Sequence, residues 1–100
     1  MSKISFFKLK GKLQFIQDLQ VIQRNNAPEL YKKMLTLETP DGQILYAELR
    51  NHKVNLIEKN DINVQDDVLV EFSFQGSEKN GKRYNNIYIN SIQKIVKSGN

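Results

Sequence analysis

Apolar and polar side chains alternate along several short stretches of this chain, and this period of two constrains the fold more than any other feature. From position 7 to position 15 the odd residues are Phe, Leu, Gly, Leu and Phe, while the even residues are three Lys and a Gln. Further along the chain, the same alternation puts four apolar side chains on one face: Val68, Val70, Phe72 and Phe74. Successive side chains of a strand point to opposite faces of its sheet. The pattern therefore predicts half-buried strands, an all-β fold and a core that contains these residues.

Turn-forming residues divide the chain into five predicted strands. Pro40-Asp41-Gly42 and Asn80-Gly81 indicate tight turns, because Pro fixes φ and Gly accepts a positive φ. A third break, at 24–29, combines two Asn with a Pro. We expect Gly11 at a bulge or sharp bend inside the first strand. The predicted strands are 7–23, 30–39, 43–50, 68–75 and 84–96.

A short helix interrupts this series of strands. Between His52 and Lys59 the apolar residues are Val54, Leu56 and Ile57, a spacing that suits one or two helical turns. Five strands with a helix between the third and the fourth is the order of a five-stranded OB-fold barrel. We expect one such domain over residues 1–100, with its core at about 7–96. In this fold the outer face of strands two and three binds oligonucleotides or oligosaccharides, and here the predicted loops 24–29 and 76–83 flank that face.

Basic residues gather at the two ends of the chain and acidic residues in its middle. Residues 1–33 carry seven Lys and Arg against two acids, 76–100 carry five against one, and 34–75 carry three against eight. Both predicted flanking loops belong to the basic segments, so barrel closure is expected to bring them to one side of the molecule. A surface polarised in this way attracts a polyanion. The alternative, a set of solvated faces without a partner, stays open.

The composition argues against several kinds of site. The chain has no Cys and one His, whereas an ordinary zinc site needs several N or S ligands. Its acidic residues, including Asp66 and Asp67, fall mostly in predicted turns, and its five glycines are too scattered for a phosphate-binding loop. We therefore expect no enzyme activity, no metal and no cofactor. No apolar run is long enough for a membrane span or a signal peptide, which predicts a cytoplasmic protein.

Two motifs resemble those of a known family. The first is Lys-x-x-x-x-Leu-Glu-Thr at 32–39, and the second is Gly-x-Glu-x-Asn-Gly-Lys at 76–82. Together with Val-Gln-Asp-Asp-Val-Leu-Val at 64–70, they are similar to sequences of small bacterial proteins with one OB-fold domain, which in turn resemble single-stranded-DNA-binding proteins. The similarity covers roughly residues 8–94. It implies the OB fold and binding of single-stranded DNA; one departure is Gln65, where the family often has Gly.

Binding of a single strand without sequence preference needs cations along its backbone and aromatic rings for its bases. Tyr46 is the first stacking candidate, since it points outward in the middle of the third predicted strand. Tyr84 and Tyr88 are further candidates, whereas Tyr31 shares the parity of Leu35 and is expected at the edge of the core. The predicted phosphate contacts are Arg24, Lys32, Arg50, Lys79, Lys82 and Arg83. Glu48 argues against this surface, because it lies beside Tyr46 on the same face.

A second hypothesis is a protein-docking module. Met34, Ile44 and Tyr46 share one face of the predicted barrel and would suit a protein interface as well as stacked bases. RNA is an alternative to DNA as the bound strand, because a stacking platform accepts either. OB-fold single-strand binders often assemble as dimers or tetramers, so a homo-oligomer is expected as a route to tighter binding.

Overall fold

Six strands and two short helical segments follow one another in the computed structural model, which describes residues 5–96. Their bounds are β1 Phe7–Ile16, β2 Gln20–Arg24, β3 Ala27–Glu38, β4 Ile44–Arg50, η1 Asn51–Asn55, α1 Leu56–Lys59, β5 Asp67–Lys79 and β6 Lys82–Lys94. The helical turns follow β4, as the change of period at His52 predicts. No helix within the described range is long and apolar enough to span a membrane.

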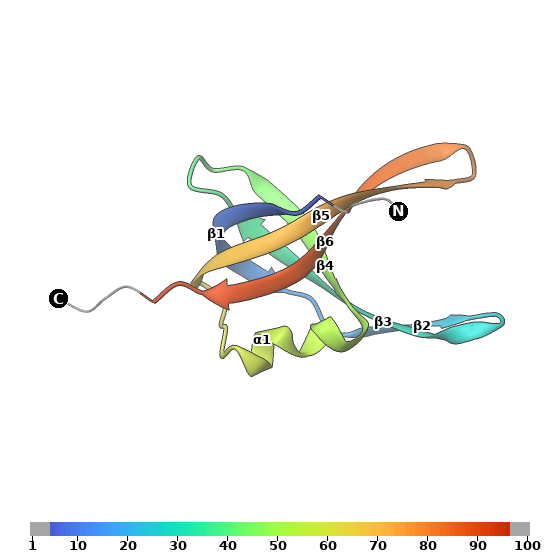
Figure 1. The fold of residues 1–100 in the computed structure, drawn as a ribbon, viewed down its shortest axis with the longest axis horizontal. Helices are drawn as coiled ribbons and strands as arrows, with labels where there is room; N and C mark the ends of the chain where they lie inside the picture. The colour runs from blue at the N-terminus through green and yellow to red at the C-terminus, as the bar shows by residue number, and fades with distance from the viewer. Residues whose placement is uncertain (1–4, 97–100) are drawn as a thin grey trace.

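Five of these strands close into a barrel (Figure 1). The pairing runs β1–β5–β6–β4–β3 and returns from β3 to β1. All of these pairs are antiparallel except β4–β6, which is parallel and is bridged by one residue pair in the described part of the chain, Glu48 with Tyr88. The strand β2 pairs with the first half of β3, whereas the second half of β3 pairs with β1. The observed topology confirms the predicted barrel and the position of its helix.

The strand β1 closes the barrel because it changes partner half-way along. Its first half pairs with β5 and its second half with β3, and Lys12 pairs with both. The change occurs beside Gly11, where a Cβ atom would lie 3.1 Å from the carbonyl oxygen of Glu38. A Cβ atom here would require the backbone at Glu38 to move by a few tenths of an ångström. The bulge of β1 lies after Leu13 and not at Gly11, so its predicted position was wrong.

The core lies inside the barrel and is formed by the alternating residues of all five barrel strands. The largest fully buried side chains are Leu13, Leu35, Leu37, Leu49, Val68, Val70, Ile89 and Ile92. The helical turns add Val54 and Ile57 to the same cluster. Burial of these aliphatic groups is the main stabilising contribution to the fold.

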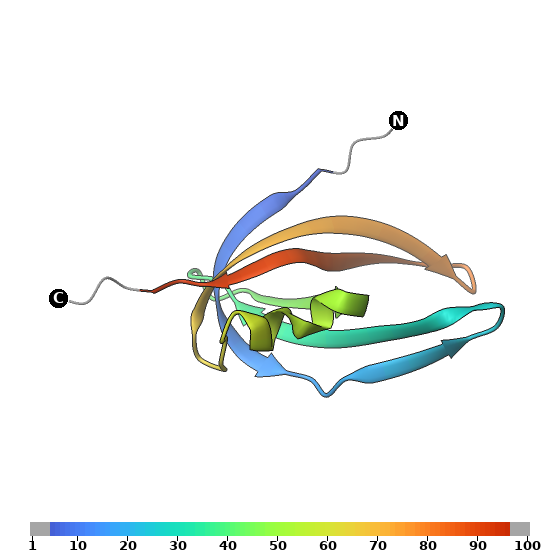
Figure 2. The same ribbon diagram turned by 60° about the horizontal axis from the view of Figure 1, so that its bottom comes forward.

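The two predicted flanking loops are β-hairpins rather than loops. The first strand ends at Ile16 instead of continuing to position 23, and β2 then forms a hairpin with β3 around Asn25 and Asn26. In the second predicted loop, 76–83, the strands β5 and β6 remain paired as far as Lys79 and Lys82. The turn therefore contains only Asn80 and Gly81, both with positive φ. We call these extensions the β2–β3 arm and the β5–β6 arm. Both project from the same end of the barrel (Figures 1 and 2).

Three phenylalanines predicted in the core lie at the surface: Phe7, Phe15 and Phe74. Phe7, at the start of β1, is 46% exposed. A bulge between Leu13 and Phe15 shifts the register of β1, so Phe15 pairs with Thr36 on the outer face and is 58% exposed. Phe74 is 56% exposed because β5 has already left the barrel at this point and entered the arm. Its ring packs against Phe7 and Phe72, with centroid distances of 5.4 and 5.3 Å. Of the four apolar residues predicted on this face of β5, only Phe74 is outside the core.

Candidate nucleic-acid interface

The outer face of the barrel carries two exposed aromatic rings on either side of one threonine. Thr36 in β3 pairs with Phe15 of β1 on one side and with Tyr46 of β4 on the other. Tyr46 is 64% exposed, as expected from its parity, and Phe15 is nearly as open. Exposed rings separated by a small residue provide flat apolar surfaces on which bases can stack. The sequence missed Phe15, because strict alternation assigns it to the core and the bulge was expected at Gly11 instead of after Leu13.

Next to this aromatic row, two cations of the outer face share one carboxylate. Glu48 is 4% exposed, and its side chain forms ion pairs with Lys32, at 3.5 Å, and with Arg50. Lys32 and Arg50 pair across β3 and β4, so both belong to one patch. The patch keeps a net charge of +1, because two cations outnumber one acid. Glu48 therefore orients the cations and does not cancel them.

Arg50 also covers an aromatic ring. Its guanidinium carbon lies 4.3 Å from the centroid of the Tyr88 ring, within the range of a cation–π contact. The predicted stacking residue Tyr88 is thus occupied on one side by Arg50. The flat guanidinium itself can stack on a base or bind a phosphate. In this structure Tyr88 acts as the support of Arg50.

A groove opens where the barrel closes between β4 and β6. We call it the seam groove; it is a hollow of about 440 Å³ lined by Phe6, Glu48, Arg50, Asn51, His52, Lys53, Ser73, Gln75, Tyr88, Ile89 and Asn90. It exists because β4 and β6 are bridged by a single residue pair in the described range. Lys53 donates a hydrogen bond to Asn90 at 3.1 Å across this gap. Phe6, which is half exposed, adds an aromatic ring to the lining of this groove and was not predicted from the sequence.

The predicted cations of the flanking segments lie on the two arms and not on the barrel face. Lys79, Lys82 and Arg83 surround the turn of the β5–β6 arm, and Arg83 is 3.6 Å from Glu78 in an exposed ion pair. Exposed pairs of this kind contribute little energy, so Arg83 remains accessible to an anion. Tyr84, 49% exposed, follows on the same arm.

Arg24 is held within the β2–β3 arm. Its Nε and one terminal nitrogen donate hydrogen bonds to the carbonyl oxygen of Pro28, at 2.9 and 2.7 Å. Tyr31, expected at the core edge, is 41% exposed on this arm. The nine predicted site residues therefore form two groups. Lys32, Tyr46, Arg50 and Tyr88 gather on the outer face, whereas Arg24, Lys79, Lys82, Arg83 and Tyr84 are on the arms.

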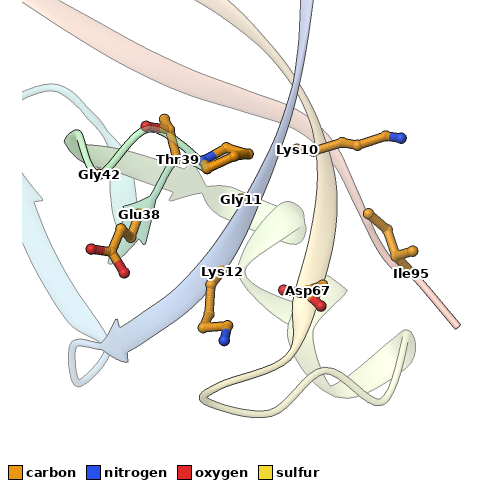
Figure 3. A pocket seen from close by; sticks show the side chains of 9 residues that line it. Lys10, Gly11, Lys12, Glu38, Thr39, Gly42, Asp67 and Ile95 are labelled. Carbon is orange, nitrogen blue, oxygen red and sulfur yellow. The ribbon is translucent and has the colours of Figure 1, made fainter. Parts of the chain in front are cut away.

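Another hollow lies between the middle of β1, the turn after β3 and the start of β5 (Figure 3). It measures about 480 Å³ and includes Lys10 and Lys12 together with Glu38 and Asp67. The formal charges of these four side chains cancel, and no aromatic residue lines the hollow. It therefore has neither a net positive charge nor an aromatic ring on which a base could stack. Asp66, beside it, accepts a hydrogen bond from the backbone of Asn63 at 2.8 Å, which confirms its predicted role in the turn.

Comparison with solved structures shows the same fold in proteins of distant sequence. The mitochondrial single-stranded DNA-binding protein of S. cerevisiae superposes with a TM-score of 0.63 at 11% identity, covering 93% of this chain and 97% of that one. The second OB-fold domain of replication protein A from Methanococcus maripaludis superposes with a TM-score of 0.62 at 16% identity. The match covers 93% of this chain and 86% of that one. The dimeric N-terminal domain of PriB from Thermoanaerobacter tencongensis superposes with a TM-score of 0.55 at 15% identity. The match covers 92% of this chain and 97% of that one.

No family of known proteins and no curated protein matches this chain by sequence. Identities of 11–16% establish a shared fold and nothing finer. The comparison nonetheless confirms the expectation drawn from the strand order and from the resembling motifs: the chain has the OB fold found in single-stranded-DNA-binding proteins.

Proposed function

We propose that this protein binds single-stranded DNA, with little sequence preference, on the outer face of β3 and β4. The aromatic row formed by Phe15 and Tyr46 around Thr36 carries this proposal, because two exposed rings on a sheet have no role in the core. The fold neighbours support it at the level of the fold, since their names describe single-stranded DNA binding or replication. The function is binding and not catalysis.

The bases stack on Phe15 and Tyr46, and the phosphates follow the cations beside them. Each stacked base contributes about 1–3 kcal/mol, which together with a few phosphate contacts corresponds to roughly micromolar affinity. Lys32 and Arg50 already hold their positions through Glu48, so they lose little conformational freedom on binding.

The arms extend this surface beyond the barrel. Lys79, Lys82 and Arg83 stand on a hairpin that projects from the same end as the β2–β3 arm. We assign them to phosphates that leave the barrel face. If about four phosphates are neutralised, affinity for a single strand falls with a slope of about −2.8 in a plot of log K against log salt.

Fluorescence anisotropy of a labelled oligo-dT of about 30 nucleotides, at about 50 and 200 mM salt, tests the proposal. We expect roughly 50-fold weaker binding at the higher salt, competition by single-stranded DNA and none by duplex DNA. A matched oligo-U competitor separates DNA from RNA, and light scattering of the complex reports whether several copies share a strand. Absence of binding at low salt with micromolar protein would overturn the proposal and favour a protein-docking barrel.

A further inference from the structure

A second hollow adjoins the seam groove and includes residues of the β2–β3 arm. This second hollow, which we call the arm pocket, has a volume of about 620 Å³ and is lined by Leu19, Glu29, Tyr31, Asn51, His52, Val54 and Asn55. Asn51 and His52 line both the seam groove and the arm pocket. The two hollows therefore adjoin at Asn51 and His52.

The chemistry of the lining changes where the two hollows meet. The seam groove contains Arg50 and Lys53, which suit phosphates, together with Glu48; among residues 5–96, no Lys or Arg lines the arm pocket. Its charged group is the carboxylate of Glu29, which repels phosphate. The apolar part comes from Tyr31 and Leu19, which are 41% and 45% exposed. An apolar wall with polar groups and no cation suits a base rather than the backbone of a nucleic acid.

Glu29 is held in place and keeps free acceptor capacity. The hydroxyl of Tyr31 donates to its Oε2 at 3.2 Å, and Nε2 of Gln23 donates to its Oε1 at 3.4 Å. A carboxylate has about four acceptor positions, so each oxygen can accept a further hydrogen bond. Nearby, Asn55 at the start of α1 makes no side-chain capping bond, which leaves its amide available to a ligand.

We propose that the arm pocket accepts a nucleobase that carries an exocyclic amino group, stacked on Tyr31 with its amino group donating to Glu29. This inference rests on the proposed function and adds a base preference to it. A carboxylate accepts from the amino group of cytosine, whereas it faces only an acceptor at the corresponding carbonyl of uracil or thymine. The protein therefore binds cytosine-containing strands more tightly than strands of uracil or thymine.

The test compares labelled 12-nucleotide oligomers of deoxycytidine and deoxyuridine by fluorescence anisotropy under identical salt. The two oligomers share sugar, phosphate and ring size and differ at the base edge. We expect the deoxycytidine oligomer to bind at least fivefold more tightly to the unmodified protein. In Glu29→Gln the ratio of the two affinities should fall toward one. The amide of Gln can accept from the amino group of cytosine and can also donate to the carbonyl oxygen of uracil.

Glu78→Gln serves as the matched control, since it removes the same unit of charge from the other arm. We expect it to leave the ratio between the two oligomers unchanged. Equal, salt-sensitive binding of both oligomers would overturn the base preference while sustaining the proposed function. An unchanged ratio in Glu29→Gln would overturn the role of Glu29. Failure of both oligomers to bind would overturn the proposed function and this inference with it.

Discussion

Replacement of Phe15 and Tyr46 by Ala, singly and together, tests the aromatic row directly. Both side chains are more than half exposed, so truncation removes little buried surface and the barrel is expected to remain folded. Each ring that stacks a base contributes about 1–3 kcal/mol, so each single variant should weaken binding of oligo-dT by about 5- to 150-fold.

The geometry also predicts how the two losses combine. Phe15 and Tyr46 each pair with Thr36, and neighbouring strands lie about 4.8 Å apart, so their Cα atoms are roughly 10 Å apart. Sites at this separation usually contribute independently to binding. The double variant should therefore lose the product of the two single factors.

Anisotropy titrations at fixed low salt measure these losses, with circular dichroism to check folding. Ile44→Ala is the matched control, because Ile44 lies on the same face of β4 and is 46% exposed but has no aromatic ring. It should change the affinity for oligo-dT by less than about twofold, and the salt slope should stay the same in every variant. If either aromatic variant bound within twofold of the parent, or if Ile44→Ala cost as much as Tyr46→Ala, base stacking on this row would be refuted.

Three further predictions concern charge and backbone strain. Replacing Lys79, Lys82 and Arg83 together by Ala should flatten the salt slope by about 2, and an unchanged slope would remove the β5–β6 arm from the interface. Glu48→Gln should destabilise the barrel by about 1–3 kcal/mol in urea denaturation, because two partly exposed cations lose their shared partner. A loss below about 0.5 kcal/mol would show that solvent screens this cluster. Gln65→Gly should raise the melting temperature by a few degrees, since Gln65 has a φ of +80° that glycine adopts without strain; a lower melting temperature would contradict this reasoning.

Alternation along the strands predicted the barrel and its helix, because most inward positions obey the period of two. It failed where a local event changes the register or the surroundings of a strand. The bulge before Phe15 inserts one residue and reverses the facing of the next. The glycine at position 11 suggested a bulge in this strand, but the bulge lies after Leu13. Phe74 has the parity of the core, but parity cannot tell how far a strand continues beyond the barrel.

The sequence predicted which residues lie on the outer face of the candidate site. It did not predict the contacts that these side chains make with one another. The parity of β3 and β4 correctly placed Lys32, Tyr46 and Arg50 on one face. That Glu48 is buried beneath two cations, and that Arg50 covers Tyr88, depends on the parallel meeting of β4 and β6, which join residues 40 positions apart. Segments with many turn formers around Asn25 and Asn80 predicted loops, whereas the flanking residues keep pairing up to the turns.

The single residue pair between β4 and β6 makes this the most weakly paired side of the barrel. A closed sheet opens first where the fewest backbone bonds hold it, so amide hydrogens along β4 and the middle of β6 should exchange with solvent before those shared by β1 and β5. A strand bound in the seam groove would contact both β4 and β6, because Arg50 and Tyr88 line the groove. Binding of a nucleic-acid strand should then slow amide hydrogen exchange in both β4 and β6. The stability of this side of the barrel is thereby coupled to ligand binding.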